Sequence, residues 1–303
     1  MHKQNIFLVG FPRSGTTLLT SLLNSHSRIC GTPETQFFAQ FLRIKSFKTT
    51  GYTSQELIDH YNKTRLRDLG ITENKVLNIA NKSRESAIIF YDKLLQKYAD
   101  RKINCSIIVE KSPDHLKHID LIKRHFPDAK IIAIIRDPRA AISSLVKTPW
   151  NTRSLKIASL EYEHQAHELE KYTDEIFIVR YEDLIEKTKF TLESLCNYIG
   201  VRFETGMVEN AGGNQIVPKW EKQWKRNSKE PPNSKSLDKW KTDISTEDIQ
   251  FIESHNHHSL LRYNYPITTC TRPTLYTKTK VLIYRFAKNA KILTDKFCPK
   301  FSK

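Results

Sequence analysis

The sequence predicts an α/β fold in which a mainly parallel central sheet lies between two layers of helices. Four short apolar runs have the composition of β-strands, and a helical pattern follows each of them: 6–9, 106–109, 130–135 and 175–179. Repeated strand–helix units of this kind are typical of parallel sheets that are covered on both faces. Two of the runs are continuously apolar along 131–135 and 176–179, as expected for strands buried on both sides.

Helices are predicted after these strands and in the long segment between the first two. Their expected ranges are 16–25, 54–67, 84–99, 114–125, 138–147, 154–173, 188–199 and 245–254. The segment 37–105 is longer than a simple crossover, so it is interpreted as an inserted helical region, where substrate selectivity often resides. Residues 211–242 are polar, basic and interrupted by prolines, which predicts a long mobile loop. We expect one domain over 1–270 and a basic, helical tail over 271–303.

The composition indicates an anionic partner. The chain of 303 residues has a formal net charge of +16, which suits a nucleotide, a nucleic acid, an acidic glycan or a membrane surface. Its five cysteines are scattered and form no C-x-x-C pair, which argues against a disulfide framework and against structural zinc. No signal-peptide core precedes the first strand, and no apolar run is long enough to span a membrane. These features predict a reducing, cytoplasmic setting.

The basic segment 277–303 has apolar residues at helical spacing and admits two interpretations. It is either an amphipathic helix that lies on anionic lipid, which would place the protein peripherally at the inner face of the membrane, or an end helix that docks on the domain with its basic face in solvent.

A glycine turn follows the first strand and precedes a helical pattern, in the string GFPRSGTT. The Walker form of a phosphate-binding loop is G-x-x-x-x-G-K-[ST]; Gly10, Gly15 and Thr17 fit it, but Thr16 replaces the lysine and the basic residue is Arg13. Backbone N–H groups in such a turn form an anion site, and an arginine adds a planar fork for two oxygens of one group. Without the lysine that reaches the outer phosphates, a 5′-phosphosulfate fits better than ATP and needs no metal.

The string GFPRSGTTLL resembles the 5′-phosphosulfate loop of the sulfotransferases that use 3′-phosphoadenosine-5′-phosphosulfate (PAPS). The resemblance implies their P-loop-like three-layer α/β/α fold, here with an inserted helical region. A second motif, KIIAIIRDPRAAISSL, has Arg136 at a strand end and Ser144 eight residues later, as in the family's grip on the 3′-phosphate. A strand end faces the ligand crevice of such a sheet. The resemblance therefore implies PAPS binding by Arg13, Ser14, Gly15, Thr16, Thr17, Arg136 and Ser144.

Two further strings supply the candidate catalytic residues. SIIVEKSPDHL resembles the second-strand segment of these enzymes, whose lysine, here Lys111, contacts the sulfuryl group or the bridging oxygen. ICGTPETQFF resembles the Golgi carbohydrate and tyrosylprotein sulfotransferases, whose glutamate base corresponds to Glu34. The histidine base of the cytosolic small-molecule enzymes is missing, because Pro113 stands two residues after Lys111. The resemblance thus implies that Glu34 is the general base and that Arg13 and Lys111 stabilise developing charge. His26 is the alternative base, although its place on the last turn of the first helix favours a structural role.

A weaker string, SKSLDKWK, resembles the loop that closes over the adenosine end in this family, which makes Lys239 and Trp240 candidate nucleotide contacts. The implied reaction moves a sulfuryl group from PAPS to an acceptor hydroxyl, releases adenosine 3′,5′-bisphosphate (PAP) and requires no metal. A carbohydrate or glycolipid is the first interpretation of the acceptor, because a basic surface suits polyanionic or membrane-borne substrates. A tyrosyl peptide is the second, because of the CG-x-x-ET string, and a small metabolite is the third.

Two other classes of function remain as alternatives. A P-loop nucleotide kinase or NTPase would use Asp137 as a carboxylate for magnesium, but the missing loop lysine weighs against it. A protein that binds nucleic acid without catalysis is supported by the net charge alone, and the chain has no RNA-binding signature, so we expect no nucleic-acid partner. The sequence leaves the oligomeric state open.

Overall fold

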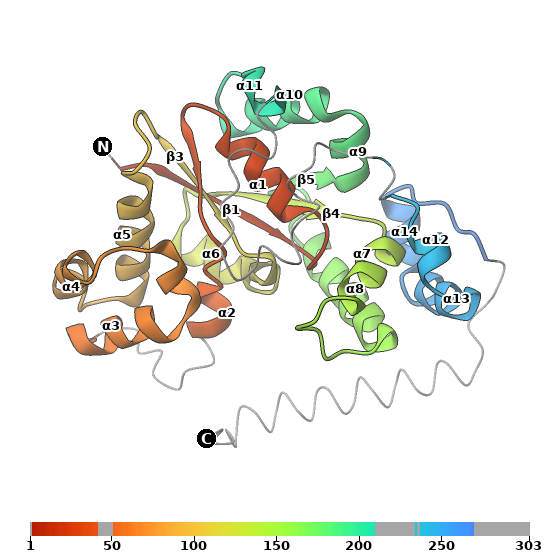
Figure 1. The fold of residues 1–303 in the computed structure, drawn as a ribbon, viewed down its shortest axis with the longest axis horizontal. Coiled ribbons are helices and arrows are strands. Elements are labelled where there is room, and N and C mark those ends of the chain that lie inside the picture. The colour runs from red at the N-terminus through yellow and green to blue at the C-terminus, as the bar shows by residue number, and fades with distance from the viewer. Residues whose placement is uncertain (1, 42–50, 210–233, 235–236, 270–303) are drawn as a thin grey trace.

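The computed structural model describes residues 2–41, 51–209, 234 and 237–269 of the chain. Within these residues, five strands form one sheet in the order β2-β3-β1-β4-β5, and every neighbouring pair is parallel (Figure 1). The strands are β1 Gln4–Gly10, β2 Ile29–Gly31, β3 Ile107–Lys111, β4 Lys130–Ile135 and β5 Phe177–Arg180. The α/β fold with a mainly parallel sheet is confirmed.

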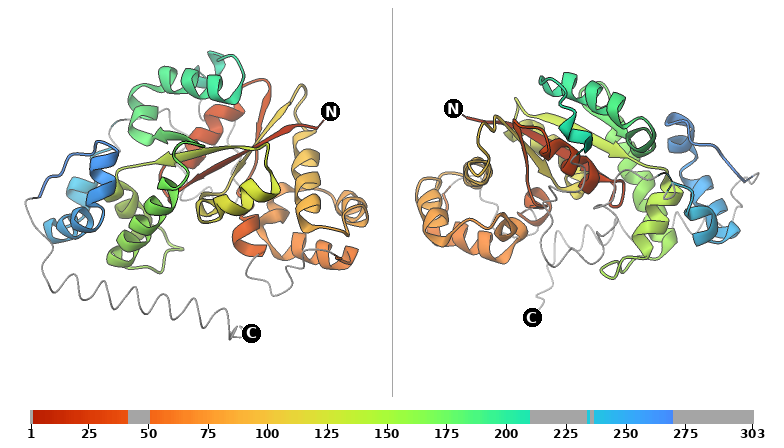
Figure 2. Two further views of the ribbon diagram at one scale, coloured as in Figure 1. Left: turned by 180° about the vertical axis from the view of Figure 1, so that it is seen from behind. Right: turned by 45° about the horizontal axis from the view of Figure 1, so that its top comes forward.

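Helices cover both faces of this sheet. Alternate residues of β1 point to opposite sides, so each face of the sheet has apolar side chains that a layer of helices buries. Ile6 and Leu8 pack in one cluster with the apolar residues of α1 and α10, whereas Phe7 and Val9 pack in another with those of α5 and α6. Figure 2 shows the two helical layers from behind and from above. The covering helices are α1 Thr16–Asn24, α9 Tyr181–Glu186, α10 Thr188–Ile199 and α11 Gly206–Glu209 on the first face, and α5 Ala87–Ala99, α6 Ile119–His125 and α8 Leu155–Glu170 on the second.

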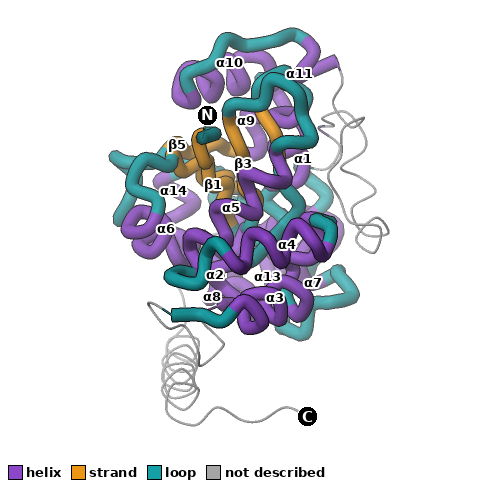
Figure 3. The backbone as a smooth tube through the Cα atoms, turned by 90° about the vertical axis from the view of Figure 1, so that its left-hand side faces the viewer, coloured by secondary structure: helices purple, strands orange, loops and turns teal. Residues whose placement is uncertain are grey.

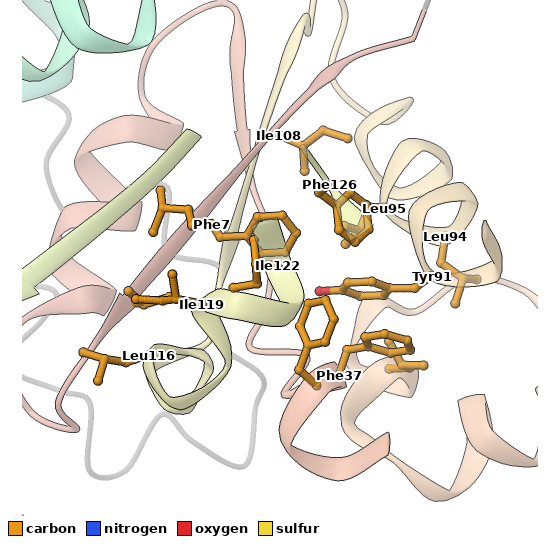
Figure 4. Close-up of a cluster of buried hydrophobic side chains, with 14 of the residues drawn as sticks. Phe7, Phe37, Tyr91, Leu94, Leu95, Ile108, Leu116, Ile119, Ile122 and Phe126 are labelled. Carbon is orange, nitrogen blue, oxygen red and sulfur yellow. The ribbon is translucent and has the colours of Figure 1, made fainter. Parts of the chain in front are cut away.

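The inserted region between β2 and β3 is helical, as predicted. It contains α2 Phe37–Phe41, α3 Ser54–Lys63, η1 Arg65–Leu69, α4 Glu73–Asn81 and α5. Figure 3, drawn from the side of this region, shows its helices gathered together. The region shares its core with the sheet, since Phe37 of α2 stacks on Tyr91 of α5 at 3.9 Å between ring centroids, and both lie in one cluster with Phe7 and Phe126 (Figure 4). Each buried aromatic side chain of this kind contributes about 1.5–3 kcal/mol of stability.

The helix α7 Pro138–Val146 follows β4 and packs against α8 and two helices near the end of the described residues. Asp137 caps the first turn of α7 and also pairs with the fully buried Arg139 at 2.6 Å. The same guanidinium contacts Glu253 and lies 4.1 Å from the ring of Trp240. Trp240 begins α12 Trp240–Asp243, Glu253 lies on α13 Thr246–His255, and α14 His257–Arg262 follows them. The short 3-10 helix η2 Pro113–His118 lies earlier in the chain, directly after β3. A buried charge with two carboxylate partners thus fixes α7 to the C-terminal helices.

The structure adds elements that the sequence patterns did not predict: β2, α2, α4, α9, α11, α12 and α14. Of these, α12 begins within the segment that was predicted to be a loop, 211–242. Most of the predicted loop 211–242 and the whole of the tail 271–303 lie outside the described residues, so those two expectations stay predictions. Among the helices that the structure describes, none is both long and apolar enough to cross a membrane.

Candidate active site

Three strand ends define one edge of the sheet, where the predicted site residues gather. β1 ends at Gly10, β3 ends at Lys111 and β4 ends one residue before Arg136. The pairing register places Leu8 opposite Lys111 and Gly10 opposite Ile134, so these ends are adjacent. The carboxyl edge of a parallel sheet is where ligands bind in this class of fold.

The loop from β1 to α1 has the geometry of an anion cradle. A Cβ on Gly10 would lie 2.5 Å from the carbonyl oxygen of Ile134, and a Cβ on Gly15 would lie 2.3 Å from the Tyr181 ring, so both positions need glycine. No side chain caps the N-terminus of α1, and the nine residues of that helix leave its first N–H groups for another acceptor.

Polar side chains of the loop face inward. The Ser14 side chain is buried, and its hydroxyl has no hydrogen-bond partner among the residues that the structure describes. Thr16 is buried at the start of α1, and Thr17 is half-buried beside it. Arg13 adopts a φ of 73°, a left-handed conformation that costs about 1–3 kcal/mol for a residue with a side chain. A buried hydroxyl without a partner, next to a strained arginine, is an arrangement that a bound anion would complete.

The structure brings Arg13, Arg136 and Ser144 together, as the motifs predict. Arg13 donates from Nε to the Ser144 hydroxyl at 3.2 Å, and Arg136 donates to the backbone oxygen of Arg13 at 3.1 Å. The Arg136 guanidinium lies 4.5 Å from the centre of the Tyr181 ring. The neighbouring Ser143 is buried, and the serine whose hydroxyl meets the loop is Ser144.

Glu34 and Lys111 also meet at this edge, although 77 residues separate them in the chain. The ammonium group of Lys111 is 3.3 Å from Oε2 of Glu34, and the Lys111 side chain is only 2% exposed. The other carboxylate oxygen, Oε1, contacts Arg65 of η1 at 3.1 Å and accepts a hydrogen bond from the Gln36 side chain. Glu34 thus has a cationic partner on each of its two carboxylate oxygens.

Arg65 is the site residue that sequence reasoning missed. It lies in the inserted region, where no string resembles a known motif, and it is held by Asp68 through its side chain and by Gln40 through its backbone N–H. The local sequence "TRLRDLG" carries no signal that this arginine, rather than Arg67, turns toward Glu34.

Lys239 and Trp240 stand at the start of α12. Trp240 is buried against Arg139, and Lys239 is exposed just before it. The short helix α12 packs on α7, the helix that carries Ser144, so the pair is tied to the site through that helix. Their contact with a nucleotide stays a prediction.

His26 and His115, the two histidines near the site in sequence, have other partners. His26 contacts the backbone oxygen of Arg202 at 2.9 Å, beyond the far end of α1. His115 is fully buried and contacts Glu110 at 3.0 Å.

Solved structures share this architecture. The sulfotransferase domain of the curacin biosynthetic pathway superposes with a TM-score of 0.64 over 88% of this chain and 99% of that domain, at 20% identity. The sulfotransferase domain of the Synechococcus PCC 7002 olefin synthase gives 0.62 over 88% and 98%, at 22% identity. At these identities the likeness concerns the fold, which is that of an α/β protein with a phosphate-type loop after its central strand.

The sequence comparisons define the family. The model of the sulfotransferase family matches residues 5–205, and the chain therefore belongs to that family. Its relatives include protein-tyrosine sulfotransferase 1 of Danio rerio, at 25% identity over 255 residues, which are 78% of this chain and 65% of the relative. Protein-tyrosine sulfotransferase 1 of Homo sapiens is 32% identical over 142 residues, which are 46% of this chain and 33% of the relative. The chain thus spans a third to two thirds of the length of these relatives.

Proposed function

We propose that this chain transfers a sulfuryl group from PAPS to an acceptor hydroxyl, with Glu34 as the general base. The observation that carries the proposal is the contact between Glu34 and Lys111 at the sheet edge that also holds the loop of Arg13. A proton acceptor, a buried cation and an anion cradle are the three parts that sulfuryl transfer needs.

The residues present fit the donor nucleotide. The glycine cradle and the buried Ser14 hydroxyl would receive the 5′-phosphosulfate, and Arg136 with Ser144 would receive the 3′-phosphate. PAPS supplies the sulfuryl group as the donor substrate. No metal is required in this scheme, because Arg13 and Lys111 supply the positive charge.

Glu34 would accept the proton of the acceptor hydroxyl as the acceptor oxygen bonds to sulfur. The bond from sulfur to the bridging phosphate oxygen breaks in the same step, so the products are the sulfate ester and PAP. Lys111 lies beside Glu34 and is the donor best placed to follow the charge that develops on the leaving oxygen. The low exposure of both side chains strengthens these electrostatic contributions.

For the acceptor, we propose a tyrosyl hydroxyl in a peptide, since relatives of this chain bear the name of protein-tyrosine sulfotransferases. This places the second interpretation of the sequence ahead of the first. The carbohydrate or glycolipid acceptor, the cytoplasmic location and the membrane contact of 277–303 stay predictions.

The kinase alternative is disfavoured by the surroundings of Asp137. Both oxygens of this carboxylate already accept hydrogen bonds from Arg139, and one of them caps α7. A carboxylate engaged in this way is poorly placed to bind magnesium for ATP chemistry.

The test combines turnover with nucleotide binding. Labelled PAPS is offered with a tyrosine-containing peptide, with the same peptide carrying phenylalanine, and with a neutral and a sulfated glycan. We expect label on the tyrosine peptide alone, and label on a glycan would restore the first interpretation. Glu34→Gln should abolish turnover and leave PAP affinity in calorimetry intact, whereas Glu34→Gln with wild-type turnover would refute the base assignment. The absence of any sulfated product, together with binding of Mg·ATP instead of PAP, would favour the kinase alternative.

A further inference from the structure

We propose that Glu110 is a positioning residue, which holds Glu34 against Lys111 through a buried chain of hydrogen bonds. The inference deepens the proposed function and rests on its assignment of Glu34 as the base. Glu110 is the residue before Lys111 on β3, and its side chain is fully buried. Burying a carboxylate without hydrogen-bond partners costs several kcal/mol of folding free energy, so the groups that pair with Glu110 indicate its role.

The geometry follows from the alternation of a strand. Glu110 and Lys111 point to opposite sides of β3, and the segment after β2 runs beside them. Lys111 meets Glu34 on one side, and Glu110 meets Thr35 on the other, where the Thr35 hydroxyl donates to the carboxylate at 2.7 Å. Glu34 and Thr35 therefore contact Lys111 and Glu110 respectively, and the contact of Glu110 holds the residue next to the base.

Several contacts hold the segment after Glu34, and one of them joins the Thr35 hydroxyl to the Tyr91 hydroxyl of α5 at 2.9 Å. Besides the contacts of Thr35, the backbone N–H of Gln36 donates to the Ser112 hydroxyl at 2.8 Å, and the backbone N–H of Phe38 donates to Nε2 of His115 at 3.1 Å. Both of these acceptors are themselves bound to Glu110. The Ser112 hydroxyl donates to Glu110 at 2.6 Å, and Nδ1 of His115 lies 3.0 Å from its second oxygen. We call residues 35–38 together with Glu110, Ser112 and His115 the base clamp.

The protonation of His115 follows from its two partners. A backbone N–H is always a donor, so the contact with Phe38 requires Nε2 to be the acceptor. The ring proton is then on Nδ1, where it is donated to Glu110. An ionised carboxylate is acceptor-only and can accept from Thr35, Ser112 and His115 together. Glu110 thereby fixes the tautomer of His115 and, through it, the position of Phe38.

A glutamine at position 110 has nearly the same shape as glutamate, but it cannot accept all of these hydrogen bonds. Its amide NH₂ would face either the Nδ1 proton of His115 or the hydroxyls of Thr35 and Ser112, all of which donate in the native arrangement. If the ring changes tautomer to accept from the amide, its Nε2 proton then faces the N–H of Phe38. In each case a buried donor loses its acceptor, and the clamp loosens.

The experiment compares the wild type with Glu110→Gln by three measurements. Nitrogen NMR of ¹⁵N-histidine protein, assigned with His115→Gln, should show the Nδ1–H tautomer in the wild type. Amide hydrogen exchange should be slow over residues 35–38 in the wild type and faster in Glu110→Gln. Turnover should fall by about tenfold to a hundredfold, as expected for a displaced catalytic group, with PAP affinity unchanged.

The pH profile separates positioning from general destabilisation. Glu34 faces Lys111 from β3 and Arg65 from η1, and Asp68 faces Arg65 in turn. If Glu34 moves away from Lys111, its ionised form loses a stabilising cation, so the acidic limb of turnover should move to higher pH. Thr35→Val, which removes one contact of the clamp, should give a smaller shift in the same direction.

Glu253→Gln is the matched control. Glu253 is also a buried carboxylate with several donors, but its partners are Arg139, Thr268 and Thr269. It should lower the melting temperature without moving the acidic limb or the exchange of 35–38. An Nε2–H tautomer in wild-type His115, or equal effects of the two glutamine variants at equal stability loss, would overturn the clamp. Slow exchange and the Nδ1–H tautomer in a wild type that sulfates no acceptor would refute the proposed function and leave the clamp standing.

Discussion

Gly15→Ala tests the cradle at the start of α1, because the structure gives two separate reasons for glycine there. The residue has a φ of 99°, and a Cβ would lie 2.3 Å and 2.7 Å from two atoms of the Tyr181 ring. The backbone conformation costs about 1–2 kcal/mol for any residue with a Cβ. The forced contact adds about 1–3 kcal/mol, as overpacking does in a filled site. We therefore expect Gly15→Ala to lose about 2–5 kcal/mol of the free energy of unfolding.

Gly200→Ala separates the two contributions. Gly200 has nearly the same φ, 95°, but the nearest atom to its Cβ would be Nζ of Lys130 at 3.9 Å. This variant should lose only the conformational part, about 1–2 kcal/mol. The difference between the two alanine variants, about 1–3 kcal/mol, then measures the contact with Tyr181 alone.

Urea unfolding at a fixed pH measures both variants, and calorimetry with PAP measures the cradle. The Tyr181 ring lies under Arg136, so a ring displaced by Gly15→Ala should also weaken PAP binding, whereas Gly200→Ala should leave it unchanged. Equal stabilities of the two variants, or wild-type PAP affinity in Gly15→Ala, would refute the reasoning from the contact.

Three further predictions concern charge. Arg136→Ala should reduce the preference for PAP over AMP by about 2–4 kcal/mol in calorimetry, as loss of a buried charged contact does, and an unchanged preference would contradict the 3′-phosphate assignment. Burial alone would raise the pKa of Glu253, but the hydrogen bonds from Thr268 and Thr269 outweigh it and hold that pKa below the ordinary 4.5. The stability that Glu253 adds is thus present above pH 4.5 and should be lost as pH falls further; urea midpoints at several pH values would show the loss, and a flat profile would contradict it. A hydrogen bond with Cys30 lowers the pKa of Cys105 to about 7, so at neutral pH iodoacetamide should label the half-buried Cys105 before the buried Cys30; the reverse order by peptide mass would count against that pair.

Much of the sheet and the loop could be predicted because their signals are local. The apolar runs of β1, β3 and β4 and the glycines of the loop lie in continuous strings, and an arginine at a strand end occupies the same edge in any parallel sheet. The strand β2 could not be predicted, because its three residues, Ile29–Gly31, are too few to show the alternation of a strand. The helix α9 could not be predicted either, because it begins at Tyr181, directly after β5, with no turn residue between them.

The contacts of the candidate base could not be predicted in the same way. Arg65 reaches Glu34 only because the insertion folds back over the sheet edge, and that approach depends on packing between helices far apart in the chain. The clamp is an intermediate case. Strand alternation already requires Glu110 and Lys111 to point to opposite sides, but which donors meet Glu110 depends on the path of residues 35–38.

The order of strands in the sheet has a consequence for biosynthesis. β1 is made first, yet it lies in the middle and pairs only with β3 and β4, beginning with Gln4 against Ile107 and Ile6 against Lys130. A ribosome adds about 5–20 residues per second, so an apolar strand waits roughly 5–25 s for its neighbours to be synthesised. Pairing across more than a hundred residues is also slow to nucleate. The strand that leads into the candidate loop is thus exposed longest on the nascent chain, and it is the segment that chaperones would have most reason to bind.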